Sequence, residues 1–225
     1  VLAALVGGCF QSGQGDATDD DTMAAYLLVY FQDSTHSLHM ALSPDGYTFT
    51  AVNEGEPVIS GEAVASQKGV RDPHITRGPD GAFYLAMTDL HIFGRRAGYR
   101  DTQWERDADL YDWGNNRGFV LMKSPDLIHW SHSNVLLDEA FEELANIGCA
   151  WAPQTIYDPA ADRMMLYFTM RLDHGRTKLY WAYTDDAFTK LTTFPKLLFE
   201  YPDSEIQVLD ADITPLPDGR YCMMY

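Results

Sequence analysis

The sequence predicts an all-β protein of the β-propeller type, and three observations support this prediction. From Tyr26 onward, short runs rich in Tyr, Phe, Val and Leu alternate with Gly, Pro and Asp turn signals, as is typical of strands. Residues 138–146 are the only segment that reads as a helix. Two motifs also recur along the chain, which indicates one structural unit used several times.

The predicted strands are short and mostly bounded by turn residues. They include residues 25–31, 37–42, 82–88, 118–124, 163–170, 178–184 and 220–225. Several of these runs alternate imperfectly between apolar and polar residues, which indicates strands buried on both faces.

The first recurring motif places Ser or Thr before Asp and an aromatic residue, at 43–49, 124–130 and 184–188. The second opens a strand pair, at 71–88, 151–169 and 209–225. Together they describe a four-stranded unit that repeats every 40–60 residues or so, which is the signature of a propeller blade. We count about three blades and the start of a fourth, and we expect the propeller to continue beyond Tyr225.

One position of the second motif differs between its copies in a chemically meaningful way. Asp72 precedes a Gly by the same spacing as Asp210, whereas the middle copy has one extra residue and carries Ala152 instead. The innermost strand of each blade lines the central channel, so we expect these three residues to converge on one mouth of it. For any single Asp the alternative is a turn residue whose oxygens bond nearby backbone N–H groups.

The first 24 residues differ in composition from the rest. Small apolar residues lead to Gly7, Gly8 and Cys9, and a polar segment rich in Gly, Ser and Asp follows. We expect residues 1–24 to be the remnant of a bacterial lipoprotein signal, lipidated at Cys9, followed by an acidic flexible tether. Residues 25–225 would form the partial propeller. The alternative is an ordinary hydrophobic N-terminus with a chance Cys.

The charge balance argues against several classes of partner. The chain has 16 Lys and Arg against 33 Asp and Glu, a net charge of −17. Nucleic-acid binders need basic patches to neutralise phosphate, so no nucleic-acid partner is expected. The 13% of aromatic residues suits stacking on sugar rings, although a large aromatic core would look the same.

Four segments, "GVRDPHI", "GFVLMKSPDLIHW", "CAWAPQTIYDP" and "LDADI…DGRYCMMY", resemble glycoside hydrolase family 43 in residue type and order. The resemblance implies a five-bladed β-propeller with arabinofuranosidase, xylosidase or arabinanase activity. It implies that Asp72 is the general base and that Asp210 tunes the pKa and orientation of the acid. The family's general acid is a Glu that has no counterpart up to Tyr225.

The same resemblance implies a set of sugar-contacting residues. His74, Trp151 and Gln154 match positions near the family's pocket, and Asp89 is a further candidate for the same surroundings. Some family members hold a cation near the propeller axis, but nothing here has the EF-hand spacing of a calcium site. We therefore expect no cofactor and assign no metal ligands, and a bound calcium stays an open alternative without support in the sequence.

The leading functional hypothesis is an inverting exo-glycosidase that acts on plant-polysaccharide side chains, with arabinofuranose favoured over xylose. The alternative is a non-catalytic glycan-binding propeller at the cell surface. In either case we expect an oligosaccharide or polysaccharide partner, a monomer, and a lipid anchor at Cys9 in a bacterial cell envelope.

Overall fold

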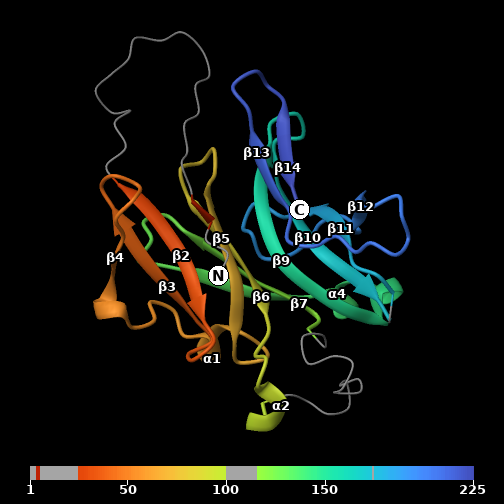
Figure 1. Ribbon diagram of the computed structural model, residues 1–225, viewed down its shortest axis with the longest axis horizontal. Coiled ribbons are helices and arrows are strands. Elements are labelled where there is room, and N and C mark those ends of the chain that lie inside the picture. The colour runs from red at the N-terminus through yellow and green to blue at the C-terminus, as the bar shows by residue number, and fades with distance from the viewer. Residues whose placement is uncertain (1–3, 6–24, 100–115, 174) are drawn as a thin grey trace.

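The computed structural model describes residues 4–5, 25–99, 116–173 and 175–225, which form three antiparallel sheets and a hairpin (Figure 1). The first sheet contains β1 (Ala4–Leu5), β2 (Tyr26–Gln32), β3 (Ser37–Ser43) and β4 (Thr50–Ala51). The second contains β5 (Val70–Arg77), β6 (Phe83–Asp89), β7 (Gly118–Ser124) and β8 (Ser131–Leu136). The third contains β9 (Ile147–Asp158), β10 (Arg163–Leu172), β11 (Lys178–Tyr183) and β12 (Lys196–Phe199). The hairpin consists of β13 (Asp212–Pro215) and β14 (Tyr221–Met224).

Each of the second and third sheets runs in chain order from its innermost to its outermost strand, as the repeat predicts. The helical segments within the described residues are each a single turn or little more. They are η1 (Asn53–Gly55), α1 (Gly61–Val64), α2 (Gly94–Ala97), α4 (Leu137–Ala140) and η2 (Glu142–Leu144). The helix predicted at 138–146 is confirmed as the short pair α4 and η2. In the part of the chain that the structure describes, no helix has the length and apolar character to cross a membrane.

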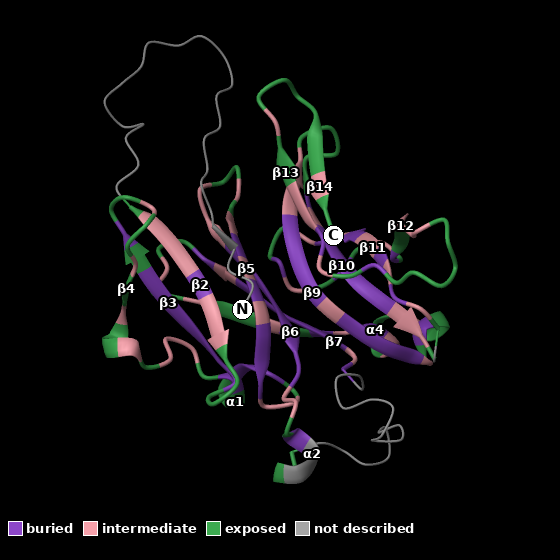
Figure 2. Cartoon of the chain, viewed as in Figure 1, coloured by how far each residue is buried: buried purple, intermediate pink, exposed green. Residues whose placement is uncertain are grey.

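The apolar core lies between adjacent sheets, as it does between the blades of a propeller. Val29 and Leu38 of the first sheet pack with Leu85 and Val120 of the second. Further along, the rings of Phe119 and Phe168 lie 4.8 Å apart between the second and third sheets. The middle strands β6, β7 and β10 are buried on both faces, which explains their nearly continuous apolar sequences (Figure 2).

The Ser-Pro-Asp motif forms a tight turn between the third and fourth strands of a sheet. In the second sheet, the Asp126 carboxylate accepts the backbone N–H groups of Ile128 at 2.9 Å and His129 at 2.8 Å. In the first sheet, Asp45 accepts those of Tyr47 and Thr48 in the same way. The backbone N–H of Thr48 and then that of Tyr47 lower the pKa of Asp45 to about 2. The motif therefore encodes a turn through its own hydrogen bonds.

The second motif forms a β-bulge in the innermost strands of the second and third sheets, β5 and β9. Asp72 and Ala152 each lie at a break in the pairing register of β5 with β6 and of β9 with β10. Asp72 has φ of 47°, Ala152 of 43° and Asp210 of 55°, so all three have left-handed backbone. A left-handed first residue is typical of one type of bulge, and the extra residue bends the strand. The three copies of the motif therefore share a backbone conformation at this position as well as a sequence pattern.

We predict that Ala152→Gly stabilises the protein. A residue with a Cβ costs roughly 1–2 kcal/mol in left-handed backbone, and glycine removes that cost. The free energy of unfolding in urea should therefore rise by about 1 kcal/mol. Ala150→Gly is the matched control. Ala150 lies in the same strand, β9, but its backbone does not have a positive φ. It should lower stability by about 1 kcal/mol, since glycine in a strand interior is more flexible when unfolded. An Ala152→Gly variant that is destabilised like its control would contradict the prediction.

Candidate active site

The bulges of β5 and β9 and the segment before β13 surround a hollow of about 230 Å³. Its lining comes from the second sheet, the third sheet and the segment that leads into the hairpin: Arg71, Asp72, Leu90, Trp151, Leu209 and Asp210. In Figure 1, β5, β9 and β13 are the strands that flank the middle of the molecule. The structure therefore brings together Asp72, Asp210 and Trp151, three of the residues that the sequence singled out.

Asp72 is held by the neighbouring strand and by the next blade. Its Oδ2 accepts a hydrogen bond from the Thr88 hydroxyl at 2.9 Å. The same hydroxyl oxygen accepts the backbone N–H of Ala152 at 2.8 Å. Burial raises the pKa of Asp72, while the Thr88 hydroxyl and the positive charge of Arg71 act in the opposite direction. The last two contacts favour the ionised carboxylate.

Asp210 occupies the same repeat position in the strand that leads into β13. Its backbone N–H donates to the Thr169 hydroxyl at 3.0 Å, as Ala152 does to Thr88. Burial, followed by the negative charge of Asp72, raises the pKa of Asp210 to about 6. Burial thus raises the pKa of both carboxylates, and only Asp72 has a hydroxyl and a guanidinium as close partners that oppose the shift.

Arg71 is the cationic residue of the hollow. Its guanidinium pairs with Asp33, in the turn between β2 and β3, and lies 4.4 Å from the centre of the Phe31 ring. The residue is only 8% exposed. These contacts fix a positive charge beside Asp72 and connect the first sheet to the site.

Trp151 supplies the aromatic surface of the hollow. It lies on β9 directly before the left-handed Ala152, and the guanidinium of Arg171 is 5.6 Å from its ring centre. The small side chain of Ala152 leaves space beside the indole. A half-buried indole at a polar hollow is suited to stacking on the apolar face of a sugar ring.

His74 and Gln154 lie two residues after the bulge positions and connect neighbouring blades. The backbone N–H of Thr155 donates to His74 Nδ1 at 3.2 Å. Burial lowers the pKa of His74 to about 4, so the ring is neutral and can accept this hydrogen bond. Gln154 Oε1 accepts the Tyr167 hydroxyl proton at 2.8 Å, and that hydroxyl oxygen accepts the N–H of Ile213. Neither side chain lines the hollow, and their contact with sugar stays a prediction.

Asp89 is 1% exposed, and its carboxylate binds the backbone of the loop after α1. Its two oxygens accept the backbone N–H groups of Ser66 at 2.9 Å and Gln67 at 2.8 Å. Burial raises its pKa, and the two N–H donors oppose that shift. Asp89 does not line the hollow, so a direct role toward substrate also stays a prediction.

Thr88 and Arg71 are site residues that sequence reasoning did not single out. A signal for Thr88 was present, because the runs "FYLAMT" and "MMLYFT" both place Thr at their sixth residue, Thr88 and Thr169. Arg71 had no comparable signal, since its counterparts in the other two copies are Trp151 and Leu209.

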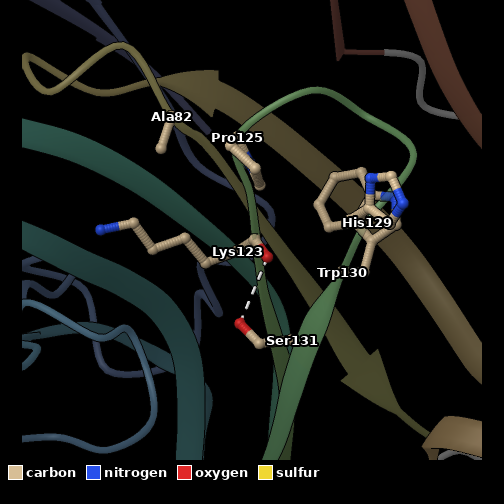
Figure 3. A pocket seen from close by; sticks show the side chains of 6 residues that line it. All are labelled: Ala82, Lys123, Pro125, His129, Trp130 and Ser131. Atoms are coloured by element: carbon tan, nitrogen blue, oxygen red, sulfur yellow. Dashed lines mark hydrogen bonds between the residues drawn. The ribbon is translucent and has the colours of Figure 1, made fainter.

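A second hollow lies on the outer side of the second sheet (Figure 3). It is lined by Ala82, Lys123, Pro125, His129, Trp130 and Ser131. Its Lys123 ammonium pairs with Asp80 at 2.8 Å and donates to the Asp186 carbonyl, and the Ser131 hydroxyl donates to the Lys123 carbonyl. The residues that line this hollow include no carboxylate.

Some sequence predictions concern residues that the structure does not describe. Cys9, most of residues 1–24 and the loop segment 100–115 lie outside the described residues. Within those that are described, no three His, Cys, Asp or Glu side chains gather in a way that could hold a metal ion.

The family can now be stated. A family model described as "Probable glycosyl hydrolase domain", of the glycoside hydrolase 43-related group, matches residues 21–224. The chain belongs to this family. The resemblance to family 43 that the sequence motifs indicated is thereby confirmed.

Individual relatives agree with this family 43-related assignment. An α-L-arabinofuranosidase of Bifidobacterium longum subsp. longum is 24% identical over 147 residues, which are 64% of this chain and 12% of that protein. A solved α-L-arabinofuranosidase from Clostridium thermocellum superposes with a TM-score of 0.56 at 15% identity, over 88% of this chain and 56% of its own. GH43B of the Bacteroides ovatus xyloglucan locus superposes with a TM-score of 0.50 at 14% identity, over 88% of this chain and 32% of its own.

These comparisons confirm the predicted propeller fold of the glycosyl hydrolase domain. The chain spans 12% of the curated relative and about a third to just over half of the two solved structures. Its described residues form three sheets and a hairpin.

We predict that Asp210→Asn flattens part of the pH dependence of stability. The folded-state pKa of Asp210 is raised to about 6, so its contribution is present below the unfolded pKa near 4 and is lost as pH rises through about 6. The neutral Asn avoids that loss. The melting temperature of the variant, relative to that of the wild type, should therefore be higher at pH 7.5 than at pH 4. Asp218→Asn is the control, because the pKa of exposed Asp218 is lowered by Arg220, and its effect should be nil or opposite. An equal difference at both pH values for Asp210→Asn would contradict the assignment.

Proposed function

We propose that this chain carries the water-activating half of an inverting exo-glycosidase site. The observation that carries the proposal is the pair of carboxylates, Asp72 and Asp210, at equivalent left-handed positions of the repeat and lining one hollow. Glycosidases of this kind use a pair of carboxyl groups that flank the scissile bond.

In this proposal Asp72 is the general base. Its carboxylate takes a proton from water as the water oxygen attacks the anomeric carbon, on the face opposite the leaving group. The hydrogen bond from Thr88 and the charge of Arg71 support the ionised state that a base needs. The proton for the leaving oxygen comes from a separate acid, which we expect to be a Glu outside residues 1–225.

Asp210 acts on that acid through its charge. Like charges raise each other's pKa, so a carboxylate at Asp210 keeps a nearby carboxylic acid protonated. The interaction of Asp210 with Asp72 is already of this kind. Trp151 offers its ring face to the sugar, and Ala152 leaves room for it where the other copies have Asp.

We propose an arabinofuranosyl side chain as the preferred substrate, with xylose as the second candidate. The similarity to the B. longum arabinofuranosidase supports arabinose. The hollow has a volume of about 230 Å³ and is lined by six residues. A hollow of that size suits the removal of single terminal sugars.

We predict that Asp72→Asn in the whole protein abolishes hydrolysis of an aryl α-L-arabinofuranoside. Loss of a general base lowers the rate about 10²–10⁴-fold, and kcat should fall while the fold persists. Asp80→Asn is the control, since Asp80 lies at the far turn of the same strand pair and binds Lys123. NMR of the first-formed product should show the inverted anomer.

Unchanged activity in Asp72→Asn would overturn the assignment of the base. A panel of aryl arabinofuranosides, xylosides and galactosides tests the substrate. If the wild-type protein binds arabino-oligosaccharides but hydrolyses none of the panel, the protein is instead the non-catalytic glycan-binding propeller.

We also propose that Cys9 carries a lipid that anchors the protein in a bacterial envelope. The small residues before Cys9 and the acidic, polar segment after it support this. Cys9→Ser should move the protein from the membrane fraction to the soluble fraction on fractionation of the bacterial host. An unchanged distribution would contradict the anchor.

A further inference from the structure

We propose that Thr88 is a positioning residue that fixes the Asp72 carboxylate to the neighbouring blade. The inference rests on the proposed role of Asp72 as general base. Thr88 lies on β6, opposite Arg71 in the strand register, and is fully buried.

The two contacts of the Thr88 hydroxyl determine where its proton points. The oxygen accepts the Ala152 N–H at 2.8 Å, and the hydroxyl lies 2.9 Å from Asp72 Oδ2. A hydroxyl has a single proton to donate. Because the Ala152 N–H can only donate, the Thr88 proton is free to be given to Asp72. The geometry therefore makes Asp72 the acceptor of this hydrogen bond, and a hydrogen bond donated to a carboxylate favours its ionised form.

The third sheet contains the same arrangement without the carboxylate. Thr169 lies on β10 opposite Trp151, as Thr88 lies opposite Arg71, and its oxygen accepts the Asp210 N–H at 3.0 Å. The bulge residue of its own sheet is Ala152, which has no side-chain acceptor. Thr169 therefore performs only the blade-to-blade contact, whereas Thr88 performs that contact and also binds the side chain of the base.

This difference has a consequence for the reaction. Thr88 fixes Asp72 relative to Ala152 and hence to the adjacent Trp151, so the base keeps its position relative to a sugar stacked on the indole. Loss of the hydroxyl leaves Asp72 less well placed and less easily ionised. Both effects act on the rate more than on substrate binding.

The test compares pH–rate profiles of Thr88→Val, Thr88→Ser and Thr169→Val in the whole protein, with an aryl α-L-arabinofuranoside as substrate. The general base must be ionised, so the acidic limb of kcat/KM should move to higher pH in Thr88→Val. A hydrogen bond to a charged group corresponds to about a tenfold effect. The loss of kcat/KM in Thr88→Val should therefore be about tenfold larger at pH values below the acidic limb than on the plateau. Thr88→Ser should restore the wild-type limb. Thr169→Val should lower kcat without moving the limb.

An unmoved limb in Thr88→Val would overturn the proposal, as would a limb that moves equally in Thr169→Val. If Thr88→Val does not fold, Thr88→Cys decides in the same way, because a thiol is a weak donor. A limb identical to that of the wild type in this variant would overturn the proposal. Asp72→Asn is measured alongside to separate the two proposals: if it stays active, the proposed function fails, whereas if it is inactive and the Thr88 limb is unmoved, only this inference fails.

Discussion

The hydrogen bond between a threonine hydroxyl and the N–H of the next blade's bulge residue is the contact on which the site depends. A bulge leaves a backbone N–H outside the regular ladder, and a buried N–H without a partner is costly. Thr88 supplies that partner for Ala152, and Thr169 supplies it for Asp210. The same contact therefore satisfies the bulge and sets where successive bulge residues lie relative to each other.

Further polar contacts between the blades complement this one. The N–H of Thr155 donates to His74, and Ile213 reaches Gln154 through the Tyr167 hydroxyl. The apolar residues between the sheets contribute most of the stabilisation, but apolar burial has no direction. Hydrogen bonds do have direction, so they determine the registration of one blade against the next. A site whose residues come from two sheets and the segment before the hairpin needs that registration.

The sequence alone allowed the repeat, its strands and the equivalence of Asp72, Ala152 and Asp210 to be predicted, because motif spacing carries that information. It did not allow the left-handed backbone to be predicted. Asp72 and Ala152 both precede proline, and residues before proline usually favour extended conformations. The tertiary context overrides that local preference. The contact of Thr88 with Asp72 was equally hidden, since it depends on the register across the bulge.

At Asp72 a left-handed backbone and an acidic side chain occur together, whereas Ala152 has the left-handed backbone alone. Its backbone has the same left-handed conformation and receives the same threonine contact, yet its side chain has no functional group. The blade therefore folds around this position through its main chain, and the side chain is not needed for folding. At such a position an acidic group can be present or absent without a change in architecture. The repeat thus provides equivalent side-chain positions around the hollow, acidic at Asp72 and Asp210 and small at Ala152.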